Sequence, residues 1–208
     1  MKMSVRILLY LLLAVTTHIA MAQSRLTVSQ ALDFWITATE KQVVQAAEAM
    51  PEEKYSFAPT GGEFTGVRTF AQQVKHLSAN NYRTAAYILV QKPTLEQEHE
   101  TGPDAVQTKA QIVDYAKGSF TALHRAIATI NQENMLEPLA AFPSAQQMTR
   151  LQLAEDVVAH SFDHYGQMVE YLRMNGIIPP ASRRQVGLLD QKLPPNMSRR
   201  VGWHVASE

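Results

Sequence analysis

Two histidines four residues apart are the residues of this sequence best suited to chemistry. His160 and His164 lie within the helical pattern AEDVVAHSFDHYGQMVEYLRMNG. On an α-helix, residues at i and i+4 lie about 40° apart on one face. Apolar residues at helical spacing surround the pair, namely Leu153, Val157, Met168 and Tyr171. We therefore expect both imidazoles to point into the interior of a helical bundle.

Buried imidazoles need a hydrogen-bond or metal partner for each ring nitrogen. A divalent metal ion would satisfy one nitrogen of His160 and one of His164 at once. Alternatively, the two are core histidines that bond to other side chains or to water. An HxxxH pair is short and common, so the pair alone leaves both interpretations open.

A third metal ligand would have to come from another helix. His76 lies about 100° from the centre of its helix's apolar stripe, with Asn80 on its flank, so it can face a neighbouring helix. His124 lies beside the apolar stripe of a later helix, and periodicity favours His76 over it only slightly. His99 stands in a polar loop, where a solvated imidazole is expected, and His204 stands in the C-terminal tail, with no helical neighbours to orient it.

Composition narrows the chemistry and the class of partner. The chain has 208 residues, of which 46% are hydrophobic and 18% charged, as in a soluble globular domain. It carries 19 basic and 19 acidic residues, so no charge surplus favours nucleic acid. There is no cysteine, which excludes disulfides, zinc thiolate sites and thiol nucleophiles. Any metal must be bound by histidine, carboxylate or amide groups.

Residues 1–22 have the pattern of a signal peptide. A short positively charged start precedes the apolar run Ile7 to Val15, and Ala20-Met21-Ala22 supplies the small residues of a cleavage site. The apolar run is shorter than the roughly 20 residues that span a bilayer. We expect cleavage after Ala22, no stable membrane anchor after processing, and an extracytoplasmic protein, either periplasmic or secreted.

Four helices are predicted, at about residues 27–50, 69–91, 108–131 and 145–175. Each follows a threonine or serine that has glutamine three residues later, which is the spacing of a capping box. These pairs are Thr27 with Gln30, Thr69 with Gln72, Thr108 with Gln111, and Ser144 with Gln147. Each stretch then repeats apolar residues at helical spacing. The stripe of the first includes Ala31, Phe34, Trp35, Ile36, Ala38, Val43 and Val44.

No alternating apolar run of strand length occurs. Asn175-Gly176 is a strong stop signal for the last helix. Four helices with one apolar face each predict an all-α protein, a four-helix bundle. We place the bundle at residues 23–180 and expect residues 181–208 to form an irregular tail.

Two runs resemble the DinB/YfiT-like superfamily of metal-binding four-helix bundles. They are FAQQVKHLSANNY in the second helix and HSFDHYGQMVEYLRMNGIIPP in the fourth. The resemblance covers about residues 30–180. Members of this superfamily hold a metal with one histidine from the second helix and two from the fourth. The resemblance therefore implies that His76, His160 and His164 are the metal ligands.

Three neutral imidazoles leave a divalent ion at least one open coordination position. Zinc, nickel and iron all suit imidazole, and such an ion can activate water or polarise a carbonyl or thiol. Asp156, Gln167 and Asn80 are predicted to orient the rings. Asp163, beside His160, is the carboxylate best placed to transfer a proton. For Asp156 and Asp163, a solvated helix charge is the alternative.

Two classes of function follow from these residues. The first is an exported metal-dependent enzyme, a hydrolase or group transferase, that acts on a small-molecule substrate. The second is a non-catalytic metal-binding or stress-related protein, in which the ion joins the second and fourth helices and His124 supplies a fourth ligand. A bundle without metal that binds a partner through its apolar surface is a third, weaker alternative. The sequence leaves a homodimer open.

Overall fold

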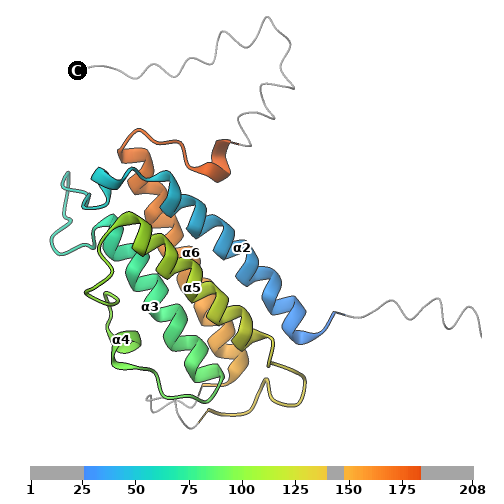
Figure 1. Ribbon diagram of the computed structural model, residues 1–208. Helices are drawn as coiled ribbons and strands as arrows, with labels where there is room; N and C mark the ends of the chain where they lie inside the picture. The colour runs from blue at the N-terminus through green and yellow to red at the C-terminus, as the bar shows by residue number, and fades with distance from the viewer. Residues whose placement is uncertain (1–25, 140–147, 184–208) are drawn as a thin grey trace, which may run out of the picture.

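Four long helices form the protein in the computed structural model, which describes residues 26–139 and 148–183 (Figure 1). The long helices are α2 (Val28–Ala49), α3 (Phe70–Ile88), α5 (Lys109–Ile127) and α6 (Arg150–Met174), and the short ones are η1 (Glu52–Lys54) and α4 (Leu95–Glu98). The described residues contain no β-strand. The predicted all-α four-helix bundle is thus confirmed.

The predicted terminal segments are described only in small part. Residues 1–22, interpreted as a signal peptide, lie outside the described residues. Of the tail predicted at residues 181–208, the structure describes 181–183, which belong to a helical turn that includes residue 180. No helix in the described part of the chain is long and apolar enough to cross a membrane.

The two helices that carry the candidate ligands pack side by side and antiparallel. Helices α2 and α3 each pack against both α5 and α6, so α3 and α6 are neighbours (Figure 1). The Arg150 side chain at the start of α6 donates to the Ile88 carbonyl at the end of α3, at 3.2 Å. The Tyr171 hydroxyl near the end of α6 donates to the Arg68 carbonyl just before α3, at 3.1 Å. This alignment brings the first half of α3 against the second half of α6.

Capping boxes start the long helices, and three of the four predicted boxes are confirmed. Thr27, Thr69 and Thr108 are the N-caps of α2, α3 and α5, and each exchanges hydrogen bonds with the glutamine three residues later. The predicted fourth start is wrong, because α6 begins at Arg150 with Thr149 as its cap. Ser144 lies in the segment 140–147, outside the described residues.

Backbone hydrogen bonds explain the later start of α6. The Leu139 amide donates to the Met148 carbonyl at 2.9 Å, and the Leu151 amide donates to the Met135 carbonyl at 3.0 Å. These bonds hold residue 148 in an extended connection, so the helix cannot include it. A second capping box then operates at Thr149, whose partner is Gln152.

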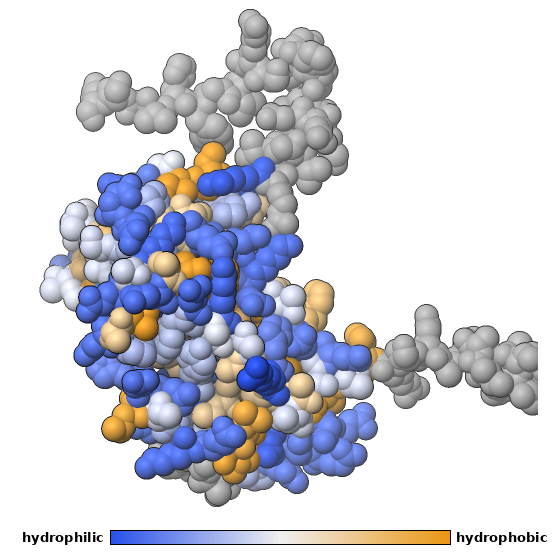
Figure 2. All heavy atoms as spheres, viewed as in Figure 1, coloured by the Kyte–Doolittle hydropathy of each residue, from blue (hydrophilic) through white to orange (hydrophobic). Residues whose placement is uncertain are grey.

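The core lies between the four helices and is apolar. Phe70 and Leu77 from α3, Phe120 from α5 and Leu172 from α6 are all fully buried. The stripe predicted for α2 is correct for Ile36 and Val43 but wrong for Ala31, Phe34 and Trp35, which are exposed, the last two by 65% and 51%. Figure 2 shows hydrophilic residues over most of the visible face, with apolar residues in small separate groups.

Candidate metal centre

Three histidines from two helices meet at one point between α3 and α6. The ligand atoms of His76, His160 and His164 all lie within 4.8 Å of one another. The Nε2 atom of His160 is 3.2 Å from Nε2 of His76 and 3.1 Å from Nε2 of His164. Metal–imidazole bonds of about 2.0–2.1 Å in tetrahedral geometry would place neighbouring nitrogens about 3.3–3.4 Å apart. The three rings therefore fit one divalent ion with little movement.

Helical spacing explains why these side chains meet. On α3, polar residues recur at intervals of three and four along the face toward α6: Gln73, His76, Asn80 and Arg83. On α6, His160, His164 and Gln167 recur at intervals of four and three, and Asp163 lies four residues before Gln167. Residues three and four apart share a helix face. Two antiparallel helices therefore bring a polar strip on each into contact.

The remaining ring nitrogen of His76 has an acceptor as its partner. Nδ1 of His76 lies 2.6 Å from the backbone carbonyl oxygen of Glu100. A carbonyl oxygen can only accept a hydrogen bond, so Nδ1 carries the proton. Nε2 of the neutral ring then keeps its lone pair toward the centre of the group, as a metal ligand requires.

His164 is held the same way, through a relay of two glutamines. Nδ1 of His164 lies 2.6 Å from Oε1 of Gln73. The Gln73 amide donates to Oε1 of Gln167 at 2.7 Å, and the Gln167 amide donates to the Asp163 carboxylate at 3.1 Å. An ionised carboxylate only accepts, so it fixes the direction of both amides. His164 therefore also carries its proton on Nδ1 and presents Nε2 as a lone pair.

The other residues predicted to orient the rings differ in how they reach them: one contacts a ring, one acts through another side chain, and one acts through its charge. Asn80 contacts His160, with its Nδ2 at 3.3 Å from the ring's Nδ1. Gln167 reaches His164 through Gln73. Asp156 is exposed one turn before His160, and its charge acts on that ring.

Burial favours the neutral form of all three imidazoles. His164 is buried, whereas His76 and His160 are partly exposed. Burial lowers the pKa of His164 to about 3, and the neighbouring His160 and His76 act in the same direction. Burial likewise lowers the pKa of His76 and of His160, against the effect of nearby carbonyl and carboxylate groups. Neutral imidazole is the form that binds a metal ion.

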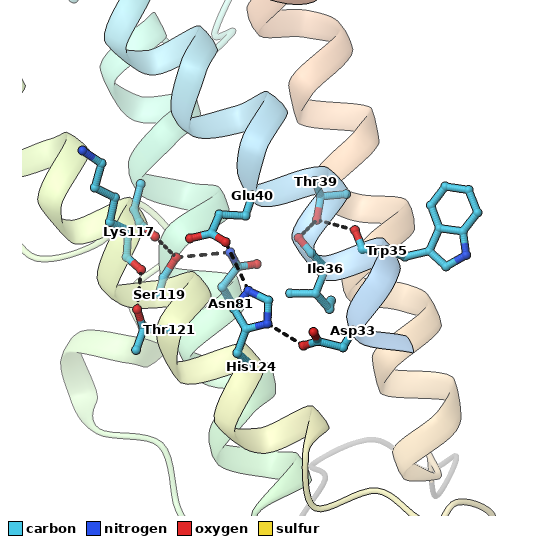
Figure 3. A network of polar contacts seen from close by, with 11 residues as sticks. Asp33, Trp35, Ile36, Thr39, Glu40, Asn81, Lys117, Ser119, Thr121 and His124 are labelled. Atoms are coloured by element: carbon cyan, nitrogen blue, oxygen red, sulfur yellow. Dashed lines mark hydrogen bonds and ion pairs between the residues drawn. The ribbon is translucent and has the colours of Figure 1, made fainter. Parts of the chain in front are cut away.

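His124 lies away from this group, at the contact between α5 and α2, and Figure 3 shows it beside Asp33 and Glu40. Its Nδ1 is 2.5 Å from Oδ1 of Asp33, and its Nε2 is 3.1 Å from Oε2 of Glu40. Both carboxylates belong to α2, so His124 links α5 to α2. The fourth ligand that a closed metal site would require is therefore not His124, whose two nitrogens are both used elsewhere.

Three contributors to the site are not among the residues predicted from the sequence. Gln73 precedes His76 by three residues on the same helix face, and this spacing is the signal that could have identified it. Arg83 follows Asn80 by three residues and donates to its side-chain oxygen at 2.7 Å. The Glu100 carbonyl comes from the loop after α4, and no residue pattern predicts a backbone contact of this kind.

Together, fold and site define a class of protein: an all-α four-helix bundle with a three-histidine group that could hold a metal ion. The sequence profile of the DinB superfamily matches residues 36–168. The chain therefore belongs to the DinB superfamily, as the resemblance of its two histidine-containing runs implied.

Solved structures show the same fold. A DinB-like protein from Bacillus cereus is 16% identical, with a TM-score of 0.57, over 74% of this chain and 96% of that one. A DinB-like protein from Bacillus subtilis is also 16% identical, with a TM-score of 0.53, over 70% of this chain and 92% of that one. At 16% sequence identity, the likeness to these two proteins is evidence of a shared fold alone. No curated protein matches the sequence.

Proposed function

We propose that this protein is a metal-dependent enzyme, a hydrolase or group transferase, whose ion is bound by His76, His160 and His164. The observation that carries the proposal is the convergence of three imidazoles, with Nε2 atoms 3.1 and 3.2 Å apart, between α3 and α6. Two of these rings are fixed, by a backbone carbonyl and a glutamine relay, in the tautomer that leaves Nε2 free.

The partial exposure of His76 and His160 supports a catalytic rather than a structural ion. A divalent ion bound there would supply Lewis-acid chemistry to a small substrate such as an ester, amide or thiol. The protein's own part is to hold neutral imidazoles in place and to move a proton. For that step we propose Asp163, which is exposed and whose charge acts on His160.

The structural-metal alternative needs a fourth protein ligand that closes the site. Its candidate, His124, contacts Asp33 and Glu40 instead. Within the described residues, the histidine group has three members. Three protein ligands would leave one coordination position of a divalent ion open for substrate or water. This supports a catalytic ion over a structural one.

Elemental analysis and a substrate screen test the proposal. We expect purified protein to contain about one divalent ion per chain, zinc, nickel or iron, and His160→Ala to lose most of it. We expect the metal-loaded protein to turn over an ester, amide or thiol-transfer substrate, with activity lost on chelation and restored by metal. Full metal occupancy in His160→Ala, or a saturated site without metal-dependent turnover across the screen, would contradict the proposal.

We also propose that the protein acts outside the cytoplasm. The support is the signal-peptide pattern of residues 1–22, which lie outside the described residues. Mass spectrometry of the extracytoplasmic fraction should find a chain that starts at Gln23. An intact precursor found solely in the cytosol would contradict this prediction.

A further inference from the structure

His160 differs from the other two histidines in the partner of its outer nitrogen. His76 and His164 face oxygen atoms that accept, whereas Nδ1 of His160 faces the side-chain amide of Asn80 at 3.3 Å. An asparagine side chain can present either its oxygen or its NH2 group. The tautomer of His160 therefore depends on which way Asn80 is turned.

Arg83 decides the direction of Asn80. Its Nη2 atom lies 2.7 Å from Oδ1 of Asn80, one helical turn away on α3. A guanidinium group has donors and no acceptor, so the oxygen of Asn80 must face Arg83. The NH2 group of Asn80 is then left to face His160, and it can only donate.

The consequence for His160 is the opposite tautomer. Nδ1 of His160 must accept from Asn80, so a neutral His160 carries its proton on Nε2. That proton points at the centre of the group, where Nε2 of His76 and Nε2 of His164 are both acceptors, at 3.2 and 3.1 Å. The one proton on Nε2 of His160 is shared between these two acceptors, so each ring nitrogen has a hydrogen-bond partner without an ion. The same arrangement blocks the lone pair that His160 would give to a metal.

We propose that Arg83, acting through Asn80, is a positioning residue that holds His160 in the tautomer opposed to metal binding. This inference rests on the proposed metal site. For His160 to bind through Nε2, its proton must move from Nε2 to Nδ1. Asn80 must then turn its oxygen toward Nδ1, and it loses its hydrogen bond to Arg83. The Arg83–Asn80 pair therefore weakens metal binding.

Substitution of Arg83 separates this role from the simple effect of charge. Arg83→Met removes the donor that fixes Asn80 and should tighten zinc binding about tenfold or more, since a hydrogen bond to a charged group no longer has to break. Arg68→Met is the matched control, because the Arg68 charge also acts on His76 and His164 while its side chain contacts Glu100. A gain in zinc affinity from the loss of positive charge alone would appear in both variants.

Nitrogen-15 NMR of the metal-free protein tests the tautomers directly. We expect His76 and His164 protonated on Nδ1 and His160 on Nε2, with His160 shifting toward Nδ1 in Arg83→Met and unchanged in Arg68→Met. Zinc titration by calorimetry then measures the affinities of all three proteins. A wild-type His160 protonated on Nδ1, or equal affinities in the two variants, would overturn the inference. Wild-type protein that binds none of zinc, nickel and iron would instead overturn the proposed function, while the tautomers would still be measurable.

Discussion

At the residue scale, Asp163 has two roles that variants can separate. It is the proposed proton-transfer group, and it also fixes the glutamine relay to His164. Asp163→Asn should slow turnover by about 10²–10⁴-fold if the carboxylate transfers a proton. Gln167→Met cuts the relay but keeps the carboxylate, so it should slow turnover far less.

The affinity for metal is the second property to measure in Asp163→Asn and Gln167→Met. Both changes remove the fixed direction of the Gln73 amide, so each should weaken metal binding by about tenfold. Equal losses of turnover in Asp163→Asn and Gln167→Met would show that Asp163 acts on the reaction through the relay alone.

His124 is expected to make stability depend on pH. Burial alone would lower the pKa of His124, but its hydrogen bonds to Asp33 and Glu40, and their charges, outweigh burial and raise it. The folded protein thus holds this proton more tightly than the unfolded chain. The stabilisation is fully present below the free-histidine pKa of about 6.5. It is lost as pH rises through the raised folded-state pKa.

Urea unfolding across this pH range measures the effect. Wild-type protein should lose stability from about pH 6.5 upward through this group, and His124→Gln should remove that part of the pH dependence. Asp33→Asn should reduce it, because one of the two carboxylates is lost. An unchanged pH profile in His124→Gln would show that the link between α2 and α5 carries no pH-dependent stability.

Residue types and helical spacing predicted part of the site. The HxxxH spacing placed His160 and His164 on one face, and periodicity placed His76 at the edge of its apolar stripe. The choice between His76 and His124 depends on which helices are neighbours, and spacing along one helix does not contain that information. The relay was missed for the same reason, since Gln73 acquires its role from Gln167, 94 residues later.

At the element scale, α3 and α6 end in the same backbone conformation but with different residues. Both helices end with a residue of positive φ, which is Val90 (φ 56°) after α3 and Gly176 (φ 72°) after α6. The chain closes each end with the same bond, from Gln91 to the Ala86 carbonyl and from Ile177 to the Leu172 carbonyl. This left-handed conformation costs a residue with a Cβ about 1–2 kcal/mol.

Val90→Gly should therefore raise the free energy of unfolding by about 1 kcal/mol. Val90 is 55% exposed, so little apolar burial is lost. Gly176→Ala is the reciprocal variant and should lower stability by about 1 kcal/mol. A Cβ at Gly176 would meet no atom within 4 Å, so conformation is the cause that remains. Urea unfolding measures both, and a destabilised Val90→Gly would contradict this account.

The number and order of the long helices follow from local signals, but some of their ends do not. Capping boxes at Thr27, Thr69 and Thr108 were sufficient to start three helices. The spacing recurs at Ser144, which lies outside the described residues, and at Thr149, where backbone bonds of the preceding loop keep residue 148 out of the helix. Phe34 and Trp35 match the apolar period of α2, yet they lie at the edge of its contact with α6, where Trp35 packs edge-on against Phe162 and both side chains remain largely exposed.

At the scale of the whole molecule, a bound ion would join α3 to α6 and should stabilise the complete bundle. A ligand that binds the folded state alone adds RT ln(1 + [L]/Kd), about 2.7 kcal/mol at a concentration of 100 Kd. We therefore expect the melting temperature of metal-stripped protein to rise with added zinc in a concentration-dependent way. His160→Ala should lose this rise yet keep its helical circular dichroism, because the apolar core between the helices does not include that ring. His99→Ala, a change in the exposed loop outside the three-histidine group, should keep the full rise. A melting temperature that rises equally in His160→Ala would place the ion somewhere other than between α3 and α6.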